Sequence, residues 1–390
     1  MKEGFFMFLA IIPESAMMIF ALIIFAATYV CLLAFSKYRA YVAIAAAVIF
    51  IIFGVLPIDS VIGAIDFNVL MMIAGTMGIV SLFIESKMPA LLADLLLKRV
   101  PNVKWAIVFL SLFAGIVALS IAKKLKISPV SSLICIAISS NLQGAATLVG
   151  DTTSIMLSGE LGMSFIDFFW YNGRPSLFFI VEAGALVSIF VLLFMFRKES
   201  QPIKWEEKTE VKDYFPTILL LGMIVLLIIA SLINIPEGFV KDHINGLIVM
   251  ALLLIGLVYK LIKTKNVKGL VSNIKEIDYF TLLLLLGLFI VIGGLEKAGV
   301  IKEISNFIQK VSQGNVFLAF TIIVWMSVLL SAFIDNIPYV LTMLPVIGAL
   351  GTSLGIDGPA YVLYFGLLVG ATLGGNLTPI GASANVAGIG

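Results

Sequence analysis

The sequence has few charged residues and almost no cysteine or histidine. Only 12% of its 390 residues are charged, whereas soluble domains carry about 25%. Its two cysteines, Cys31 and Cys135, stand alone in apolar segments, which argues against a disulfide framework or a cysteine-rich metal site. The one histidine, His243, is expected to have a structural or interfacial role. No Walker motif is present, and a net charge of +2 gives no indication of nucleic-acid binding.

Apolar residues, in contrast, make up 61% of the chain, and the mean hydropathy is +1.15. Several stretches approach the roughly 20 apolar residues that cross a bilayer as a helix: 16–35, 39–56, 175–196, 214–233, 243–262 and 278–295. Alternating segments typical of a barrel are absent from the sequence, so helices must satisfy the backbone. We read the first apolar stretch as a retained helix, because it has no cleavage site. The sequence predicts an all-α polytopic membrane protein.

The chain also contains an internal repeat. "DFNVLMMIAG" (66–75) matches "DYFTLLLLLG" (278–287) at an offset of 212, and "NLQGAATLVGDTTS" (141–154) matches "TLGGNLTPIGASAN" (372–385). We expect two repeats of about five transmembrane helices each, 1–196 and 214–390, joined by a charged cytoplasmic linker at 197–213.

An odd number of crossings would invert the second repeat relative to the first. If the N-terminus is extracytoplasmic and the arm at 104–120 belongs to a re-entrant hairpin, 19 of the 25 Lys and Arg residues fall on the cytoplasmic side. The positive-inside rule favours this topology. A fully crossing 104–120 segment would instead place the basic segments 86–104 and 123–126 on opposite sides.

The glycine- and hydroxyl-rich stretches in the two repeats are candidates for broken helices. Inverted repeats with paired broken helices build the midplane site of secondary transporters, where unwound carbonyls and hydroxyls suit a small cation. The candidate binding residues in these stretches are Asn141, Thr147, Gly150, Asp151, Thr152 and Thr153 in the first and Thr378, Gly381, Ser383 and Asn385 in the second.

A third stretch with polar residues is "SAFIDNIPYVLTMLPV" (331–346), where Asp335 and Asn336 precede Pro338. An ionisable residue at membrane depth costs several kcal/mol and needs a partner or a use. Asp335 could bind a cation or proton, or it could cap the helix that follows. The same two interpretations apply to Asp151. Glu182, in the middle of 175–196, could carry protons or could be a structural acid.

These three stretches carry a family resemblance that extends over most of the chain. The sequence resembles the ion transporter superfamily, within it the arsenite and sodium/proton antiporter (ArsB/NhaD) branch that includes the pigmentation P protein, and more distantly the divalent anion/sodium symporters. The resemblance implies a homodimer with a scaffold and a moving transport domain. It also places Asp335 and Asn336 at a hairpin tip that meets substrate or coupling ion, and Gly150 to Thr153 and Gly381 to Asn385 on two unwound loops.

The sequence departs from the family pattern in two ways. Many members read Gly-Asp-Pro-Pro-Asn in the first loop, where this chain reads Gly-Asp-Thr-Thr-Ser. The repeat offset also jumps from 211 at Ser120 to 229 at Leu125, which predicts that the first hairpin lacks about 18 residues after Ser120. The sequence given stops at Gly390, before any counterpart of 175–196. We therefore expect that residues of the native chain are missing at both points.

Together these features predict an ion-coupled secondary transporter of a small ion, oxyanion or oxyacid, working by elevator-type alternating access in the plasma membrane. Na+ or H+ is the expected coupling ion, with Na+ at the loops of Asp335, Asp151 and Asn385, and no other cofactor is expected. Alternatives are an arsenite-type efflux permease with an external ATPase, and a passive channel. A channel would favour a continuous polar stripe, which the sequence lacks. An enzyme would need a catalytic dyad or metal cluster that we do not find in it.

Overall fold

The computed structural model describes residues 13–113, 129–199, 201–202, 209–265, 267–356 and 360–378. The expected gap between Ser120 and Ile121 lies outside these residues, as do Gly381, Ser383 and Asn385. The helices of the first part are α2 (Glu14–Ala34), α3 (Arg39–Ile52), α4 (Val61–Ala64), α5 (Phe67–Glu85), α6 (Met88–Leu97), α7 (Val103–Phe113), α9 (Pro129–Gly144), α10 (Thr152–Leu161) and α11 (Leu177–Met195). Those of the second part are α12 (Phe215–Leu232), α13 (Phe239–Thr264), α14 (Val267–Lys275), α15 (Tyr279–Lys297), α16 (Val300–Val311), α17 (Val316–Ser331), α18 (Asn336–Ser353) and α19 (Tyr361–Gly374).

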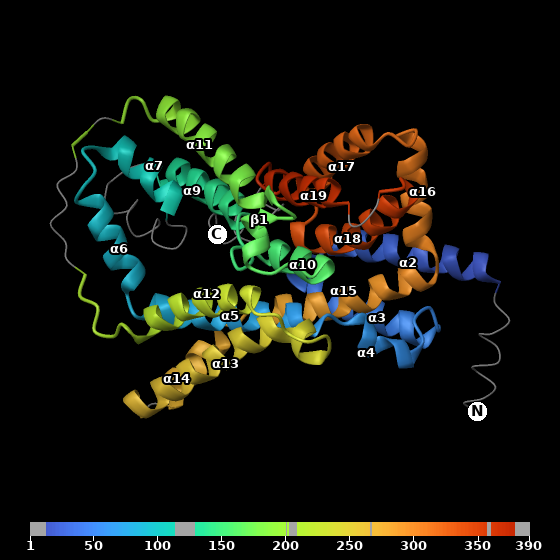
Figure 1. Ribbon diagram of the computed structural model, residues 1–390, viewed down its shortest axis with the longest axis horizontal. Helices are drawn as coiled ribbons and strands as arrows, with labels where there is room; N and C mark the ends of the chain where they lie inside the picture. Colours follow the sequence, from blue (N-terminus) through green and yellow to red (C-terminus); the bar gives the residue numbers. More distant parts are fainter. Residues whose placement is uncertain are drawn as a thin grey trace.

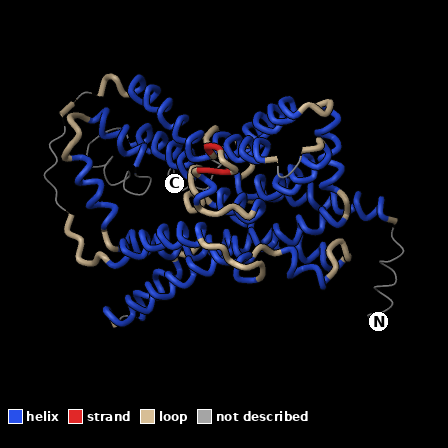
Figure 2. The backbone as a smooth tube through the Cα atoms, in the orientation of Figure 1, coloured by secondary structure: helices blue, strands red, loops and turns tan. Residues whose placement is uncertain are grey.

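Helices dominate the described chain (Figure 2). Short 3-10 turns lie at Ser36–Tyr38, Ile58–Ser60 and Ile166–Phe168, and the strands β1 (Trp170–Tyr171) and β2 (Arg174–Pro175) form an antiparallel hairpin. Among the described residues, six helices are long and apolar enough to cross a membrane: α2, α5, α11, α12, α13 and α15. The protein is therefore an all-α polytopic membrane protein, as the composition predicts.

The second apolar stretch, 39–56, forms a shorter helix than its hydropathy suggests. α3 ends at Ile52, after 14 residues. Gly54 then adopts a left-handed conformation (φ 70°), and the N–H groups of Val55 and Leu56 turn back to the carbonyl of Phe50. Glycine permits this conformation without a side-chain clash, so it stops the helix inside an apolar run.

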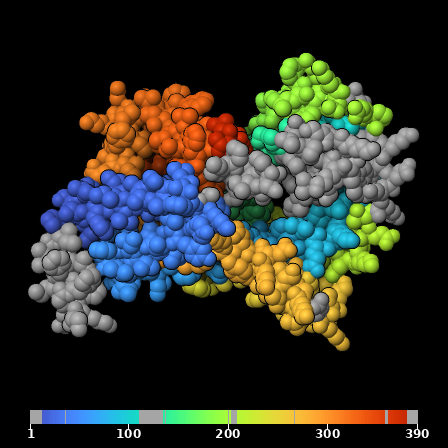
Figure 3. Space-filling view, turned by 180° about the vertical axis from the view of Figure 1, so that it is seen from behind, coloured from blue at the N-terminus to red at the C-terminus, as the bar shows by residue number. Residues whose placement is uncertain are grey.

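The helices form two layers (Figure 1). One contains α3, α5, α12, α13 and α15, and the other contains α7, α9, α10, α11, α17, α18 and α19, while α6 and α16 run between them at opposite ends. Seen from behind, the blue surface of the N-terminal helices adjoins the orange surface of the C-terminal half (Figure 3). The two parts of the chain thus pack against each other and share a core.

Within the first layer, helices of the two parts pair reciprocally. α5 packs along α13, and α15 packs along α3. Gly75 and Gly287, which the repeat aligns, allow the close approach of the two helices in each pair. A Cβ on Gly75 would lie 3.0 Å from the backbone carbon of Val249, and one on Gly287 would lie 2.6 Å from that of Ala43. The lack of a side chain at these two positions brings the backbones together, as small residues do between membrane helices.

The repeat also appears in the caps of these helices. The side chain of Asp66 accepts the N–H of Val69 at the start of α5, and that of Asp278 accepts the N–H of Thr281 at the start of α15. Both are N-cap interactions that satisfy a free helix donor. Matching caps and matching close contacts support the predicted inverted repeat, which remains a prediction.

Candidate functional site

The stretch "FIDNIP" forms a break between two helices. α17 ends at Ser331, α18 begins at Asn336, and Asp335 is its N-cap residue. Oδ1 of Asp335 accepts the N–H of Ile337 at 3.2 Å, so the capping interpretation holds. Asn336 is buried in the first turn of α18. Pro338 also lies in that turn, where its missing N–H would be unbonded in any case.

The other oxygen of Asp335 has a different partner. Its Oδ2 forms an ion pair with Nη1 of Arg39, the first residue of α3. The side chains are 12% and 18% exposed, respectively, so the pair is largely shielded from water. Nearby, the hydroxyl of Tyr29 donates to the carbonyl oxygen of Pro338 at 2.8 Å and lies 2.6 Å from Oγ1 of Thr342. The start of α18 is therefore held by the facing ends of α2 and α3.

The first broken helix is confirmed between α9 and α10. Residues 145–151 form a compact turn in which Gly150 donates its N–H to the carbonyl of Thr147 at 3.1 Å. A Cβ on Gly150 would lie 2.4 Å from the carbonyl oxygen of Gly144, so only glycine fits. The unwound segment is shorter than expected, because α10 already begins at Thr152, and Thr152 and Thr153 belong to its first turn.

Asp151 is the N-cap residue of α10. Its Oδ1 accepts the N–H of Thr152 at 2.7 Å, and its Oδ2 accepts the hydroxyl of Thr153 at 2.8 Å. These threonines orient the carboxylate, and the charge of Asp151 lies within electrostatic reach of Asp335. Asp151 and Asp335 thus cap two helices, α10 and α18, that pack against each other. Each could ligate a cation, because carboxylate and hydroxyl oxygens suit small hard cations.

The two halves also meet through their polar breaks. Nδ2 of Asn141, at the end of α9, donates to Oδ1 of Asn376, just beyond α19, at 2.7 Å. The hydroxyl of Thr378 donates to the carbonyl of Ala332, in the turn that leads to Asp335. We call the side chains of Asn141, Asp151, Asp335, Asn376 and Thr378 the junction.

The junction contains four of the twelve predicted binding residues, and the structure adds Asn376 within it and Arg39 beside it. Asn141, Asp151, Asp335 and Thr378 were predicted, whereas Asn376 and Arg39 were not singled out. Asn376 lies in the quoted motif "GGNLTPIGASAN", so its position was a usable signal. In the sequence analysis Arg39 was only counted among the cytoplasmic Lys and Arg residues, because nothing in the local sequence links it to Asp335, 296 residues away.

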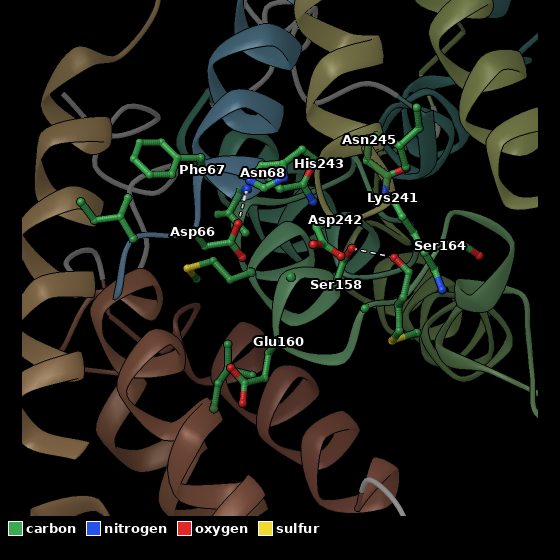
Figure 4. Close-up of a pocket in the computed structure, with 18 of the residues that line it drawn as sticks. Asp66, Phe67, Asn68, Ser158, Glu160, Ser164, Lys241, Asp242, His243 and Asn245 are labelled. Carbon is green, nitrogen blue, oxygen red and sulfur yellow. Dashed lines mark hydrogen bonds between the residues drawn. The ribbon is translucent and has the colours of Figure 1, made fainter. Parts of the chain in front are cut away.

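A polar cavity of about 910 Å³ is lined by the last turn of α10 and the middle of α18 (Figure 4). Its lining comes from the start of α5 and α13 and the ends of α12 and α15 as well. Its charged and ionisable side chains are Asp66, Glu160, Asp167, Lys241, Asp242, His243 and Glu296. In Figure 4, Asp66 and Asn68 lie close to His243, and Glu160 lies apart from them.

Two further residues considered in the sequence analysis, His243 and Glu182, lie outside the junction. His243 stacks on Phe239 and its Nδ1 lies 2.8 Å from the carbonyl oxygen of that residue, at the start of α13. Glu182 is half-buried in α11. No group of three or more His, Cys, Asp or Glu side chains with metal-binding geometry occurs among the residues that the structure describes.

Comparison with known proteins agrees with this architecture. A protein family described as CitMHS, citrate transporter, matches residues 20–370. The chain is 29% identical over 279 residues to a 46 kDa membrane protein of Mycobacterium leprae. The aligned region covers 69% of this chain and 61% of that protein. The chain is 30% identical over 281 residues to an uncharacterized transporter of Mycobacterium tuberculosis, covering 70% and 62%.

A shorter match links the chain to a eukaryotic protein. It is 38% identical over 116 residues to the P protein of Mus musculus, covering 28% of this chain and 14% of that protein. The chain spans about three fifths of the length of the two bacterial relatives. Because the family match covers most of the helices described above, the chain belongs to the CitMHS family of membrane transporters.

Proposed function

We propose that the protein is a secondary active transporter that moves a small anion or oxyacid together with, or in exchange for, Na+ or H+. The junction carries this proposal. It combines two carboxylates at helix starts with amide and hydroxyl groups from both halves of the chain. Such a set of oxygen atoms suits a small cation, and its position between broken helices is typical of transporter sites.

The substrate class follows from the charges at the junction. The family description names citrate, a tricarboxylate, yet the carboxylate of Asp335 would repel a carboxylate substrate once it is released from Arg39. A bound cation would remove this repulsion, so we propose that a carboxylate substrate binds together with a cation. Arsenite, a neutral oxyacid at pH 7, would need no such cation and is the second substrate to test.

The polar cavity is the proposed aqueous access to the junction from the extracytoplasmic side. α10 and α18 both begin at the junction, and both line the cavity further along, through Glu160 and Leu344. We further propose a homodimer in the plasma membrane that uses elevator-type alternating access. Light scattering of the purified protein in detergent would establish the number of subunits.

Flux into proteoliposomes tests the transport proposal. The panel contains citrate, arsenite and Na+, each with and without an imposed Na+ or pH gradient. We expect gradient-driven accumulation of one substrate, and its loss in the Asp151→Asn and Asp335→Asn variants. Downhill flux that ignores both gradients would indicate a channel instead, and accumulation that needs an added ATPase would indicate an efflux permease.

A further inference from the structure

The ion pair of Arg39 and Asp335 joins α3, a helix of the first layer, to the proposed ion site. Arg39 opens α3, which packs along α15, and its second guanidinium nitrogen lies 3.5 Å from the hydroxyl of Thr281 in α15. Asp335 opens α18, in the other layer (Figure 1). The pair therefore spans the two layers of the protein at the point where a coupling ion would bind.

The two oxygens of Asp335 are used in different ways. Oδ1 accepts the N–H of Ile337 and caps α18, and Oδ2 accepts from Arg39. A cation that is ligated by Oδ2 and a guanidinium that donates to Oδ2 would occupy the same space. Binding of a metal cation through this oxygen thus requires Arg39 to leave.

Release of Arg39 from Asp335 is costly, and it becomes favourable when a cation replaces the guanidinium. While Arg39 is paired, one of the two carboxylates at the junction is neutralised. When Arg39 leaves, Asp335 loses the positive charge that pairs with its Oδ2. Because Oδ2 accepts from Arg39 in this structure, a metal cation bound to that oxygen would take the position that the guanidinium gives up.

We propose that Arg39 competes with the coupling cation for Asp335 and thereby sets the cation affinity of the transporter. This inference rests on the proposed function, since it takes Asp335 as an ion-binding group. In the conformation described here, Arg39 holds the place of a monovalent metal cation such as Na+. The apparent Na+ affinity equals the intrinsic affinity multiplied by the fraction of molecules in which Arg39 is released.

Equilibrium binding of radioactive Na+ to the purified full chain in detergent tests the proposal. Arg39→Gln removes the competing charge and should lower the apparent dissociation constant by about tenfold or more. Arg39→Lys keeps a cation without the planar fork, and its affinity should lie between those of Arg39→Gln and the wild type. Lys37→Gln is the matched control, because Lys37 is an exposed cation two residues away, and its affinity should stay within about twofold of the wild type.

The double variant Arg39→Gln/Asp335→Asn shows whether the effect passes through Asp335. It should bind Na+ as poorly as Asp335→Asn alone. Unchanged or weaker binding by Arg39→Gln would overturn the proposal, as would equal tightening by Lys37→Gln. If Arg39→Gln does not fold, Arg39→Lys decides by the same comparison, and wild-type affinity in that variant overturns the proposal.

Failure of this inference can be told apart from failure of the proposed function. Suppose that gradient-driven flux depends on Asp335 but that the Na+ affinity is insensitive to Arg39. This result would refute only the proposed competition between Arg39 and Na+. The same holds for proton-driven flux by a protein that binds no Na+. The absence of any ion-driven flux in the wild type would refute the transporter proposal itself.

Discussion

At the scale of single residues, the two oxygens of Asp335 allow its structural and electrostatic roles to be separated. Asparagine at this position keeps an oxygen that can cap α18, and a lost cap alone would cost about 1 kcal/mol. Its amide nitrogen, however, would face the donors of Arg39. Removing one partner of a largely buried pair costs more than removing both, because it leaves a charge without compensation.

The first prediction is a coupling between Arg39 and Asp335 in stability. Asp335→Asn should lower the free energy of unfolding by about 1–3 kcal/mol, a value reduced from that of a fully buried pair because both side chains are partly exposed. Arg39→Gln/Asp335→Asn should recover part of this loss. Thermal unfolding of the four proteins in one detergent gives the double-mutant cycle, and additive effects would show that the pair contributes nothing.

The second prediction concerns Asp66, which caps α5 and lines the polar cavity. Burial raises the pKa of Asp66 above its ordinary value, although backbone N–H donors and the nearby His243 act in the opposite direction. An acid whose pKa is raised by folding contributes stability below its ordinary pKa. That contribution is lost as the pH rises through the folded-state value.

Asp66→Asn removes this titration and keeps an oxygen for the N–H of Val69. The unfolding temperature of the wild type should therefore fall relative to that of the variant as the pH rises from about 4, the ordinary pKa of an aspartate. Measuring both unfolding curves across this range checks the sign. A constant difference between the two proteins would mean that Asp66 does not titrate differently in the folded state.

At the scale of elements, close contacts between helices fix the geometry of the site. α15 lies against α3 through Gly287, and this contact places Arg39 and Thr281 beside the start of α18. The third prediction is that Gly287→Ala destabilises the protein by about 1–3 kcal/mol, because its Cβ would lie 2.6 Å from the backbone of Ala43.

Gly222 in α12 provides the control for this substitution. Apart from the local backbone of α12, no atom of the described residues lies within 4 Å of a Cβ placed there, so Gly222→Ala should be neutral or slightly stabilising through its better helix propensity. Unfolding temperatures of the two variants in the same detergent test the difference. An equal response at both positions would show that the α3–α15 contact is looser than the structure indicates.

At the scale of the whole molecule, the predicted inversion of the two repeats has a consequence for sidedness. With the N-terminus outside, the region around Lys198 should face the cytoplasm and the start of α13 should face the exterior. Cys31 and Cys135 are the cysteines of the chain, so replacing both with serine gives a background without thiols. Lys198 and Lys241 are both exposed in the structure.

The fourth prediction is that Lys241→Cys in this background reacts with a membrane-impermeant maleimide in intact cells. Lys198→Cys should react only after permeabilisation. The reversed pattern would place the N-terminus in the cytoplasm, and reaction of both from outside would contradict the topology. This measurement does not depend on transport activity, so it tests the architecture by itself.

The sequence alone determined the class of the protein, because apolar runs of sufficient length can satisfy their backbone in a bilayer only as helices. Its repeat aligned Asp66 with Asp278 and Gly75 with Gly287, but their roles as helix caps and close-contact positions are seen only in the structure. Asp151 and Asp335 could be singled out from the sequence, since polar residues beside helix breaks are visible in a single stretch.

The partners of these residues were decided by the tertiary structure. Arg39 meets Asp335, and Asn141 meets Asn376, across 296 and 235 residues. Nothing local specifies such pairs. They arise because glycine contacts bring α3 to α15, and because helices from both halves begin or end at the same place. The same packing left the polar cavity between the ends of several helices, whose lining residues come from segments far apart in the sequence.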